Sequence, residues 1–280
     1  MTLHPHPPYR SQRGRAAARV TALASAAVMA VCATALGAVY WHQEALLFQP
    51  APLPKCHSFA IPDTREVSIE VDGATLSALH LTLPNPKGVV FFLHGNGGNL
   101  ASWFTSPGFY RHVNYDLFMI DYRGYGKSTG RIESEAQLRA DVRRAWDWVA
   151  PRYAGKANVI YGRSLGSALA SGLAAEVQPA LTILVSPYCS MAELARLHYP
   201  LIPTVLLRYP LSTCDDAARL RSPLLLLHGE QDAIIPIAQS KQIRARAPLA
   251  ELVAIAGAGH NDVHRFDAYT EVLVQHLRAL

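Results

Sequence analysis

The stretch Gly162-Arg163-Ser164-Leu165-Gly166 has the form G-x-S-x-G and separates an apolar segment, 157–161, from an Ala- and Leu-rich segment, 165–177. The first segment predicts a buried strand and the second a helix. On so sharp a strand-to-helix turn, the serine is held in a strained backbone conformation, and the two glycines permit close approach that side chains would block. The turn therefore predicts that the Ser164 hydroxyl is a nucleophile exposed at a helix N-terminus.

A serine hydroxyl needs a histidine as base, and the histidine needs a carboxylate that fixes its tautomer. On strand-turn-helix folds of this kind, the chain order is serine, acid, histidine. Asp232 lies in the loop after the apolar run 224–227, and His260 lies in the glycine-rich loop after the apolar run 252–256. The carboxyl ends of parallel strands share one edge of a sheet. We therefore predict a catalytic triad of Ser164, Asp232 and His260.

Each residue also has a simpler interpretation. Ser164 is a good helix N-cap, and Asp232 is a good cap for a helix beginning near Pro236. Three other carboxylates compete for the role of the acid: Glu230, Asp262 and Asp215. Asp232 is favoured because it alone combines the strand end, the loop and the chain order.

A third apolar run, 89–93, ends in His94-Gly95-Asn96-Gly97-Gly98-Asn99. Glycines in such a loop let backbone amides face a substrate, and ester cleavage needs donors for the negative charge on the carbonyl oxygen. We assign this oxyanion hole to the backbone amides of Asn96 and Leu165. His94 and His228 each precede a glycine at a strand end, and we expect both to be structural.

With these motifs the chain resembles the α/β-hydrolases, and specifically the membrane-anchored serine hydrolases with a short lid. The similarity runs from about Phe48 to the C-terminus and also includes the loop 121–128, Asp-Tyr-Arg-Gly-Tyr-Gly-Lys-Ser. The resemblance implies the same triad, Ser164, Asp232 and His260. It also implies action on ester or thioester bonds, often of lipids or acylated proteins. Such chemistry needs no metal ion or organic cofactor, and no cysteine or histidine cluster has metal-ligand spacing.

Strands and helices alternate along most of the 280 residues, which is enough for one domain with a large core. Two segments around Asp72-Gly73 predict an antiparallel hairpin, 67–71 and 75–83. Helices are expected at 134–149, 165–177 and from about Asp262 to Leu280. The expected later strands lie near 89–93, 117–120, 157–161, 180–185, 223–228 and 251–256. The pattern predicts an α/β fold with a doubly wound, mostly parallel sheet over residues 66–280.

Residues 187–222 interrupt the alternation and are rich in Leu, Tyr and Pro. Two interpretations stay open. The segment is a small helical lid whose apolar residues favour an acyl chain in the pocket, or these residues complete the core.

The N-terminal arm, residues 1–19, holds four arginines, and the first acidic residue of the chain is Glu44. Residues 20–40 carry no charge and are long enough to span a bilayer as a helix. The flanking arginines predict a signal anchor with a cytoplasmic N-terminus and the catalytic domain outside the cytoplasm. Cleavage as a signal peptide near Gly37, with secretion or periplasmic release, is the alternative. Residues 41–65 are expected to be a linker.

Without the arm, basic and acidic residues nearly balance, so nothing supports binding to nucleic acid. Three cysteines follow the span, Cys56, Cys189 and Cys214. Cys189 and Cys214 flank the same insertion and are the favoured disulfide pair. Oligomeric state and disulfide state are not determined by these patterns.

The sequence predicts a serine hydrolase that cleaves ester or thioester bonds of lipid-like or other apolar acyl substrates through an acyl-enzyme. A peptidase or acyltransferase with the same triad is the alternative within this class. A binding protein that has kept the hydrolase scaffold without its activity is the alternative from another class.

Overall fold

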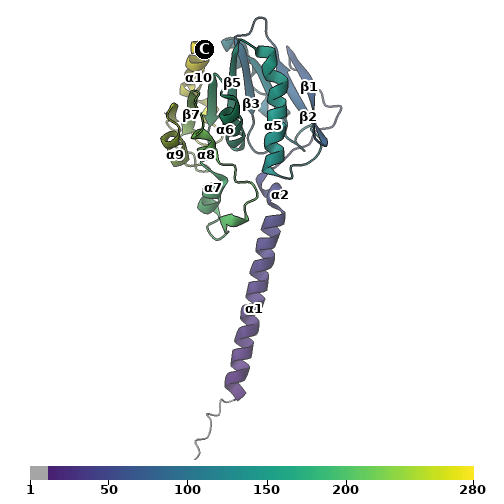
Figure 1. Cartoon of the computed structure of the whole chain (residues 1–280), viewed down its shortest axis with the longest axis vertical. Helices are drawn as coiled ribbons and strands as arrows, with labels where there is room; N and C mark the ends of the chain where they lie inside the picture. The colour runs from purple at the N-terminus through teal and green to yellow at the C-terminus, as the bar shows by residue number, and fades with distance from the viewer. Residues whose placement is uncertain (1–11) are drawn as a thin grey trace, which may run out of the picture. The chain divides into compact units, whose positions relative to one another are not determined.

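The computed structural model describes residues 12–280, and its contacts divide the chain into two units, Met1–Gln43 and Glu44–Leu280. The first unit contains one long helix, α1 (Gln12–Trp41), shown in purple in Figure 1. Its segment Gly14–Trp41 contains an 18-residue stretch with a mean hydropathy of 2.1 and is long and apolar enough to cross a membrane, a property that signal sequences share. Residues 1–11, which make up most of the expected basic arm, lie outside the described residues.

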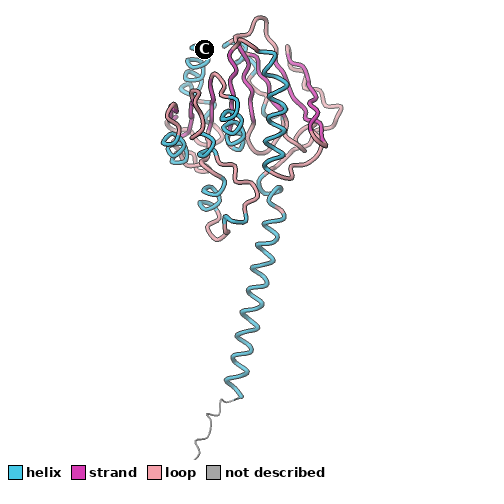
Figure 2. Tube along the Cα trace, in the orientation of Figure 1, coloured by secondary structure: helices cyan, strands magenta, loops and turns pink. Residues whose placement is uncertain are grey.

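The second unit is built on one sheet of eight strands in the order β1-β2-β4-β3-β5-β6-β7-β8. Strand β2 runs antiparallel to both its neighbours, and the pairs from β4 through β8 are parallel. Figure 2 shows these strands in magenta, with helices on either side. The strands are β1 (Thr64–Val71), β2 (Ala74–Leu81), β3 (Gly88–Leu93), β4 (Asp116–Ile120), β5 (Ala157–Arg163), β6 (Leu181–Val185), β7 (Leu224–Gly229) and β8 (Ala250–Ile255).

Two hydrophobic clusters cover the two faces of the sheet. In β3, Val89 and Phe91 belong to one cluster and Val90 and Phe92 to the other, because successive side chains of a strand point to opposite faces. The first cluster includes residues of α5 (Glu135–Val149), α6 (Leu165–Val177), α8 (Thr213–Ala217) and α9 (Ala238–Arg246). The second includes residues of α3 (Leu100–Trp103), α4 (Pro107–Val113) and α10 (Asp267–Ala279). The predicted doubly wound, mostly parallel fold is confirmed.

The last helix begins later than predicted. A 3₁₀ turn, η3 (Val263–Arg265), follows Asp262, and Phe266 then takes an extended conformation with ψ of 135° before α10 begins at Asp267. The carboxylate of Asp262 is already used by the turn before it, since it accepts a hydrogen bond from the Gly259 amide at 2.7 Å. The expected start was wrong because a local capping residue served a loop instead of a helix.

The segment 187–222 contains α7 (Met191–His198), the 3₁₀ turn η2 (Thr204–Leu206) and α8. A disulfide joins Cys189 and Cys214, which confirms the favoured pair. The apolar side chains of this segment divide into two groups. Tyr209 is fully buried in the core, whereas Leu201 is 93% and Val205 87% exposed. Part of the segment therefore completes the core, and part presents apolar side chains at the surface.

Residues between α2 (Gln43–Leu47) and β1 are attached to the body at several points. Phe48 is buried in the first cluster. Pro50 pairs with Gly98 and Pro52 with Gly126 in isolated bridges. These contacts tie the expected linker to the loops that follow β3 and β4.

Candidate active site

Ser164 lies at the turn between β5 and α6 and has the strained backbone expected for it, with φ of 51° and ψ of −118°. A non-glycine residue rarely adopts such a positive φ, and the conformation costs on the order of 1–3 kcal/mol. Ser164 occupies the N-cap position of α6, but its side chain caps no amide of the helix. The hydroxyl is thus available for another partner, which separates this serine from an ordinary helix cap.

The two glycines of the motif allow the turn to pack closely. A methyl group on Gly166 would overlap the carbonyl oxygen of Leu93 and lie 2.6 Å from that of His94. On Gly162 it would lie 2.5 Å from both the Ala170 side chain and the Gly166 carbonyl oxygen. Strand β3, strand β5 and helix α6 can therefore meet only where both positions lack a side chain.

The structure brings the three predicted triad side chains together. His260 Nε2 lies 3.0 Å from Ser164 Oγ, and His260 Nδ1 lies 2.7 Å from Asp232 Oδ2. The imidazole is mostly buried and the Asp232 carboxylate is fully so. An ionised carboxylate only accepts hydrogen bonds, so Nδ1 carries the proton and Nε2 is free to accept from the serine hydroxyl. This arrangement has the geometry required for a nucleophile and its base.

Both oxygens of Asp232 are occupied. Oδ1 accepts hydrogen bonds from the amides of Ile234 (3.0 Å) and Ile235 (2.7 Å), which forms a local turn before α9. Oδ2 faces His260 and also lies 3.3 Å from Nε2 of His228. Burial raises the pKa of the carboxyl group, but the hydrogen bonds from His228, His260 and the Ile235 amide outweigh it and hold the pKa of Asp232 well below its usual value.

His228 orients the acid, a role that its place before a glycine did not reveal. Its Nδ1 lies 2.7 Å from the Ser240 hydroxyl, and its Nε2 lies 2.7 Å from the Ile235 carbonyl oxygen. Because that carbonyl only accepts, Nε2 carries the proton and points it towards both Ile235 and Asp232. The sequence feature that could have indicated this role was the position of His228 at the end of β7, four residues before Asp232.

The rival acids have other partners. Asp262 binds the Gly259 amide, and Asp215 is largely exposed and pairs with Arg246 at 3.1 Å. Glu230 is exposed at the surface. Among these carboxylates, Asp232 is the one hydrogen-bonded to His260.

The loop after β3 is held by its own side chains. Asn96 Oδ1 accepts hydrogen bonds from the amides of Gln49 (2.9 Å) and Gly97 (2.8 Å) and from the Tyr125 hydroxyl (3.1 Å). Within residues 12–280, the backbone amides of Asn96 and Leu165 donate to no other group. Both amides therefore remain available as donors, and the Asn96 side chain fixes the loop that carries one of them.

His94 is fully buried, as expected for a structural residue. Its Nδ1 donates to the Gly95 carbonyl oxygen at 2.8 Å, and its ring stacks on Trp103 at a centroid distance of 5.7 Å. Trp103 in turn donates from Nε1 to the Gly97 carbonyl oxygen at 2.9 Å. These contacts hold the loop after β3 in place.

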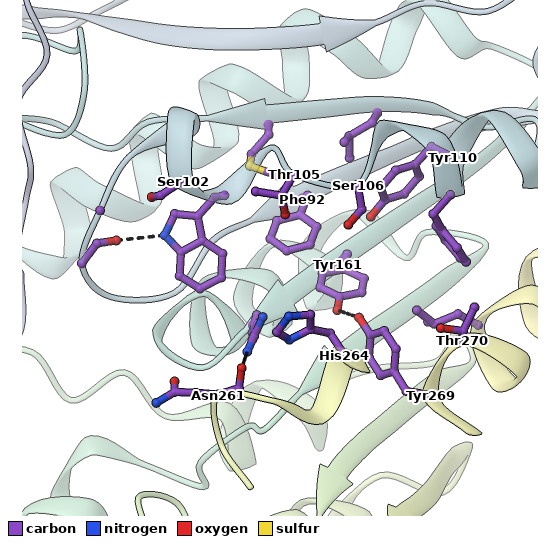
Figure 3. A pocket seen from close by; sticks show the side chains of 18 of the residues that line it. Phe92, Ser102, Thr105, Ser106, Tyr110, Tyr161, Asn261, His264, Tyr269 and Thr270 are labelled. Atoms are coloured by element: carbon purple, nitrogen blue, oxygen red, sulfur yellow. Dashed lines mark hydrogen bonds between the residues drawn. The ribbon is translucent and has the colours of Figure 1, made fainter. Parts of the chain in front are cut away.

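A cavity of about 550 Å³ lies beside this site. Its lining includes Asn96 of the loop after β3, Arg163, which precedes Ser164, and Asn261, which follows His260. Figure 3 shows aromatic side chains, among them Phe92 and Tyr161, gathered around the cavity. In the described part of the chain, no group of three or more His, Cys, Asp or Glu residues is arranged to hold a metal ion.

The comparisons with known proteins agree with this architecture. Residues 84–213 match the family described as "Serine aminopeptidase, S33". An uncharacterised protein of Mycobacterium tuberculosis is 32% identical, over 89% of this chain and 92% of its own length. Alpha/beta hydrolase domain-containing protein 17B of Homo sapiens is 33% identical, over 69% of this chain and 67% of its own. A solved structure of the Pyrococcus furiosus esterase Pf2001 has a TM-score of 0.68 at 17% identity, covering 83% of this chain and 98% of that one.

Proposed function

Because this chain belongs to the α/β-hydrolase superfamily, and its relatives and structural neighbours support a hydrolase, we propose that it is a serine esterase that cleaves carboxylic ester or thioester bonds. The observation that carries the proposal is the position of His260, which bridges the hydroxyl of Ser164 and the carboxylate of Asp232. A buried acid, an oriented imidazole and a strained serine in one hydrogen-bonded series have the chemistry of an activated nucleophile.

In the proposed reaction, Ser164 Oγ attacks the carbonyl carbon of the substrate while His260 Nε2 takes the hydroxyl proton. Asp232 stabilises the imidazolium, and the amides of Asn96 and Leu165 bind the oxyanion. The tetrahedral intermediate collapses when His260 returns the proton to the leaving alcohol or thiol. Water, activated by His260, then attacks the acyl-enzyme and releases the carboxylic acid and the free serine.

We propose that the acyl group of the substrate is apolar. The support is the apolar composition of the segment 187–222 and the aromatic side chains beside the site. A series of 4-nitrophenyl esters of increasing acyl length, tested beside lysophospholipids, examines this proposal. Rising kcat/KM towards long chains agrees with it, and a preference for acetyl or butyryl esters contradicts it.

A peptidase is the second candidate, favoured by the description of the matching family as a serine aminopeptidase. The same triad attacks amides, which have poorer leaving groups than esters. Turnover of aminoacyl 4-nitroanilides at rates comparable to those of the matched esters would favour this candidate over an esterase.

We propose that α1 anchors the protein in a membrane, with the N-terminus in the cytoplasm and the catalytic unit outside it. The support is the length and hydropathy of α1, the arginines at and before its N-terminal end, and the disulfide, since disulfides persist in oxidising compartments. Removal of the segment as a signal peptide would leave the same catalytic unit free outside the cytoplasm.

The decisive test replaces Ser164 with alanine. If the triad acts as a unit, Ser164→Ala lowers kcat about 10⁶-fold and abolishes covalent labelling by a fluorophosphonate probe. Ser58→Ala, which removes an exposed hydroxyl, is the matched control and retains labelling and turnover. Near-normal ester cleavage by Ser164→Ala would refute the assignment. An unlabelled wild-type protein that turns over no ester or amide would point to a binding protein.

A further inference from the structure

The cavity of about 550 Å³ lies against the second hydrophobic cluster, between the loop after β3, helix α4 and helix α10. It does not include Ser164 or His260 in its lining, yet it reaches their sequence neighbours, Arg163 and Asn261. Asn96, one of the two proposed oxyanion donors, also lines it. A ligand in this cavity would therefore lie next to the segments that carry the proposed reaction centre.

Aromatic side chains form part of the walls of the cavity. Phe92 and Tyr161 stack with a centroid distance of 4.3 Å, and the hydroxyls of Tyr161 and Tyr269 are 2.5 Å apart. Figure 3 shows these three rings together with Tyr110 and His264 around one space. Flat, rigid walls with a few hydroxyl groups suit a flat or chain-like apolar group that has one polar end.

Arg163 is the one fully charged residue in the lining. Among the described residues that line the cavity there is no aspartate or glutamate. Burial lowers the pKa of His264, and the charges of Arg163 and Arg265 lower it further, so the neutral form of His264 is favoured. The cavity therefore carries a single positive charge.

That charge has no carboxylate partner. Within the described residues, no acidic group lies within 4 Å of the Arg163 guanidinium. Its Nη2 makes only long contacts to the carbonyl oxygens of His260 (3.3 Å) and Asn261 (3.4 Å), and its Cζ atom lies 5.4 Å from the centroid of the Trp103 ring. A guanidinium has five N–H donors in a fork that matches a carboxylate, so most of its capacity is unused here.

We propose that this cavity binds the part of the substrate that carries a free carboxylate, and that Arg163 is the specificity-determining residue that pairs with it. The preferred substrates are then esters with an aromatic or acyl body that ends in a carboxylate. A single guanidinium balances a monoanion, whereas a phosphate monoester carries a charge of about −1.5 to −2 at pH 7. The site therefore favours a carboxylate over a phosphate monoester.

This inference deepens the proposed esterase function, but binding in the cavity is testable without any chemistry. Isothermal titration of the full-length Ser164→Ala protein in a nonionic detergent would compare 4-phenylbutyrate with its neutral analogue 4-phenylbutan-1-ol. We expect the carboxylate to bind at least about tenfold more tightly. Equal affinities, or tighter binding of 3-phenylpropyl phosphate than of the carboxylate, would overturn the proposal.

The same titration in Arg163→Gln should abolish the preference for the carboxylate. The control is Arg265→Gln, which removes an equal charge from an exposed residue of η3, next to the lining residue His264, that does not itself line the cavity. The control should keep the preference. If both substitutions weaken carboxylate binding equally, the preference comes from long-range electrostatic attraction to positive charge, and the assignment of the carboxylate to Arg163 fails.

Arg163 also contacts carbonyl groups of the loop that carries His260, so its substitution could lower activity by disturbing that loop. A kinetic comparison separates this structural effect from an effect on the preference for a carboxylate. The ratio of kcat/KM for mono-4-nitrophenyl glutarate to that for 4-nitrophenyl valerate should fall about tenfold in Arg163→Gln. A merely structural arginine would lower both rates together and leave the ratio unchanged, which would contradict the proposal. If the wild type cleaves neither ester while the binding preference persists, the esterase proposal fails and the carboxylate site stands.

Discussion

At the residue scale, the site depends on how one carboxylate is held. Asp232 divides its two oxygens between a backbone turn and two imidazoles, His228 and His260. The turn makes Asp232 a local capping residue, and the imidazoles make it the acid of the proposed triad. The interpretation of Asp232 as a helix cap was wrong, because Ile237 occupies the N-cap position of α9 and Asp232 binds only the turn before it.

Asp232→Asn should lower kcat about 10⁴-fold, because an amide directed at His260 Nδ1 favours the tautomer that has no free Nε2 lone pair. Steady-state hydrolysis of a 4-nitrophenyl ester measures the effect. Glu230→Gln, an exposed acid in the same loop, is the matched control and should stay within about threefold of wild type. A large loss in Glu230→Gln or Asp262→Asn combined with an active Asp232→Asn would mean that a different acid serves the histidine.

The same substitution has a pH-dependent effect on stability. The folded-state pKa of Asp232 is lowered below the unfolded value of about 3.9, so its ionised form stabilises the fold above about pH 4, and this contribution is lost as the pH falls further. The difference in free energy of unfolding between wild type and Asp232→Asn should therefore be larger at pH 7 than at pH 3. Urea denaturation at the two pH values tests it, and a difference that grows towards acid would contradict the lowered pKa.

At the element scale, the turn between β5 and α6 depends on space as much as on chemistry. Gly166 faces the carbonyl oxygens at the end of β3, which are backbone atoms that cannot move aside as a flexible side chain would. The serine, the strand and the helix are thus held in one arrangement by a position that only glycine can occupy. The strain at Ser164 persists because packing on both sides leaves no alternative path.

Gly166→Ala should destabilise the fold by about 3 kcal/mol, because the added methyl group overlaps the backbone of β3. Thermal unfolding measures the change. The control is Gly108→Ala in α4, where a methyl group meets no atom within 4 Å. Alanine there should be neutral or stabilise the protein by up to about 1 kcal/mol, because it is the better helix former. Equal stability of the two variants would refute the packing argument.

At the scale of the whole molecule, the cysteines report where the catalytic unit resides. Cys189 and Cys214 are joined, while Cys32 and Cys56 are free and exposed in the described chain. Cys32 belongs to the candidate span, which leaves Cys56 as the free thiol of the catalytic unit. A single accessible thiol makes the side of the membrane measurable.

In sealed, right-side-out membrane vesicles, a membrane-impermeant maleimide should label Cys56 if the catalytic unit lies outside the cytoplasm. Cys56→Ser should abolish the label, because Cys189 and Cys214 are buried and joined to each other. Labelling of Cys56 only after the vesicles are opened would place the unit in the cytoplasm and overturn the proposed orientation. Recovery of the protein in the soluble fraction, with an N-terminus near Gly37, would instead indicate cleavage.

The sequence by itself determined the alternation of strands and helices, the serine turn and the uncharged N-terminal span, and it favoured the pair Cys189 and Cys214 without determining that they are joined. These features are local: periodicity, turn chemistry and strand ends are encoded within a few neighbouring residues. Ser164, Asp232 and His260 were also predicted from strand-end positions. They lie within hydrogen-bonding distance, and their catalytic role stays a prediction.

Only the tertiary structure decided which carboxylate meets His260, that His228 orients that carboxylate, and which apolar residues of 187–222 are buried. It alone revealed the cavity, whose walls come from β3, β4, β5, α3, α4 and α10. The physical reason is that, apart from the contact between His228 and Asp232, these contacts join segments tens of residues apart. These segments come together only when the helices pack on the sheet and the intervening chain forms closed loops. A local sequence pattern does not contain that information.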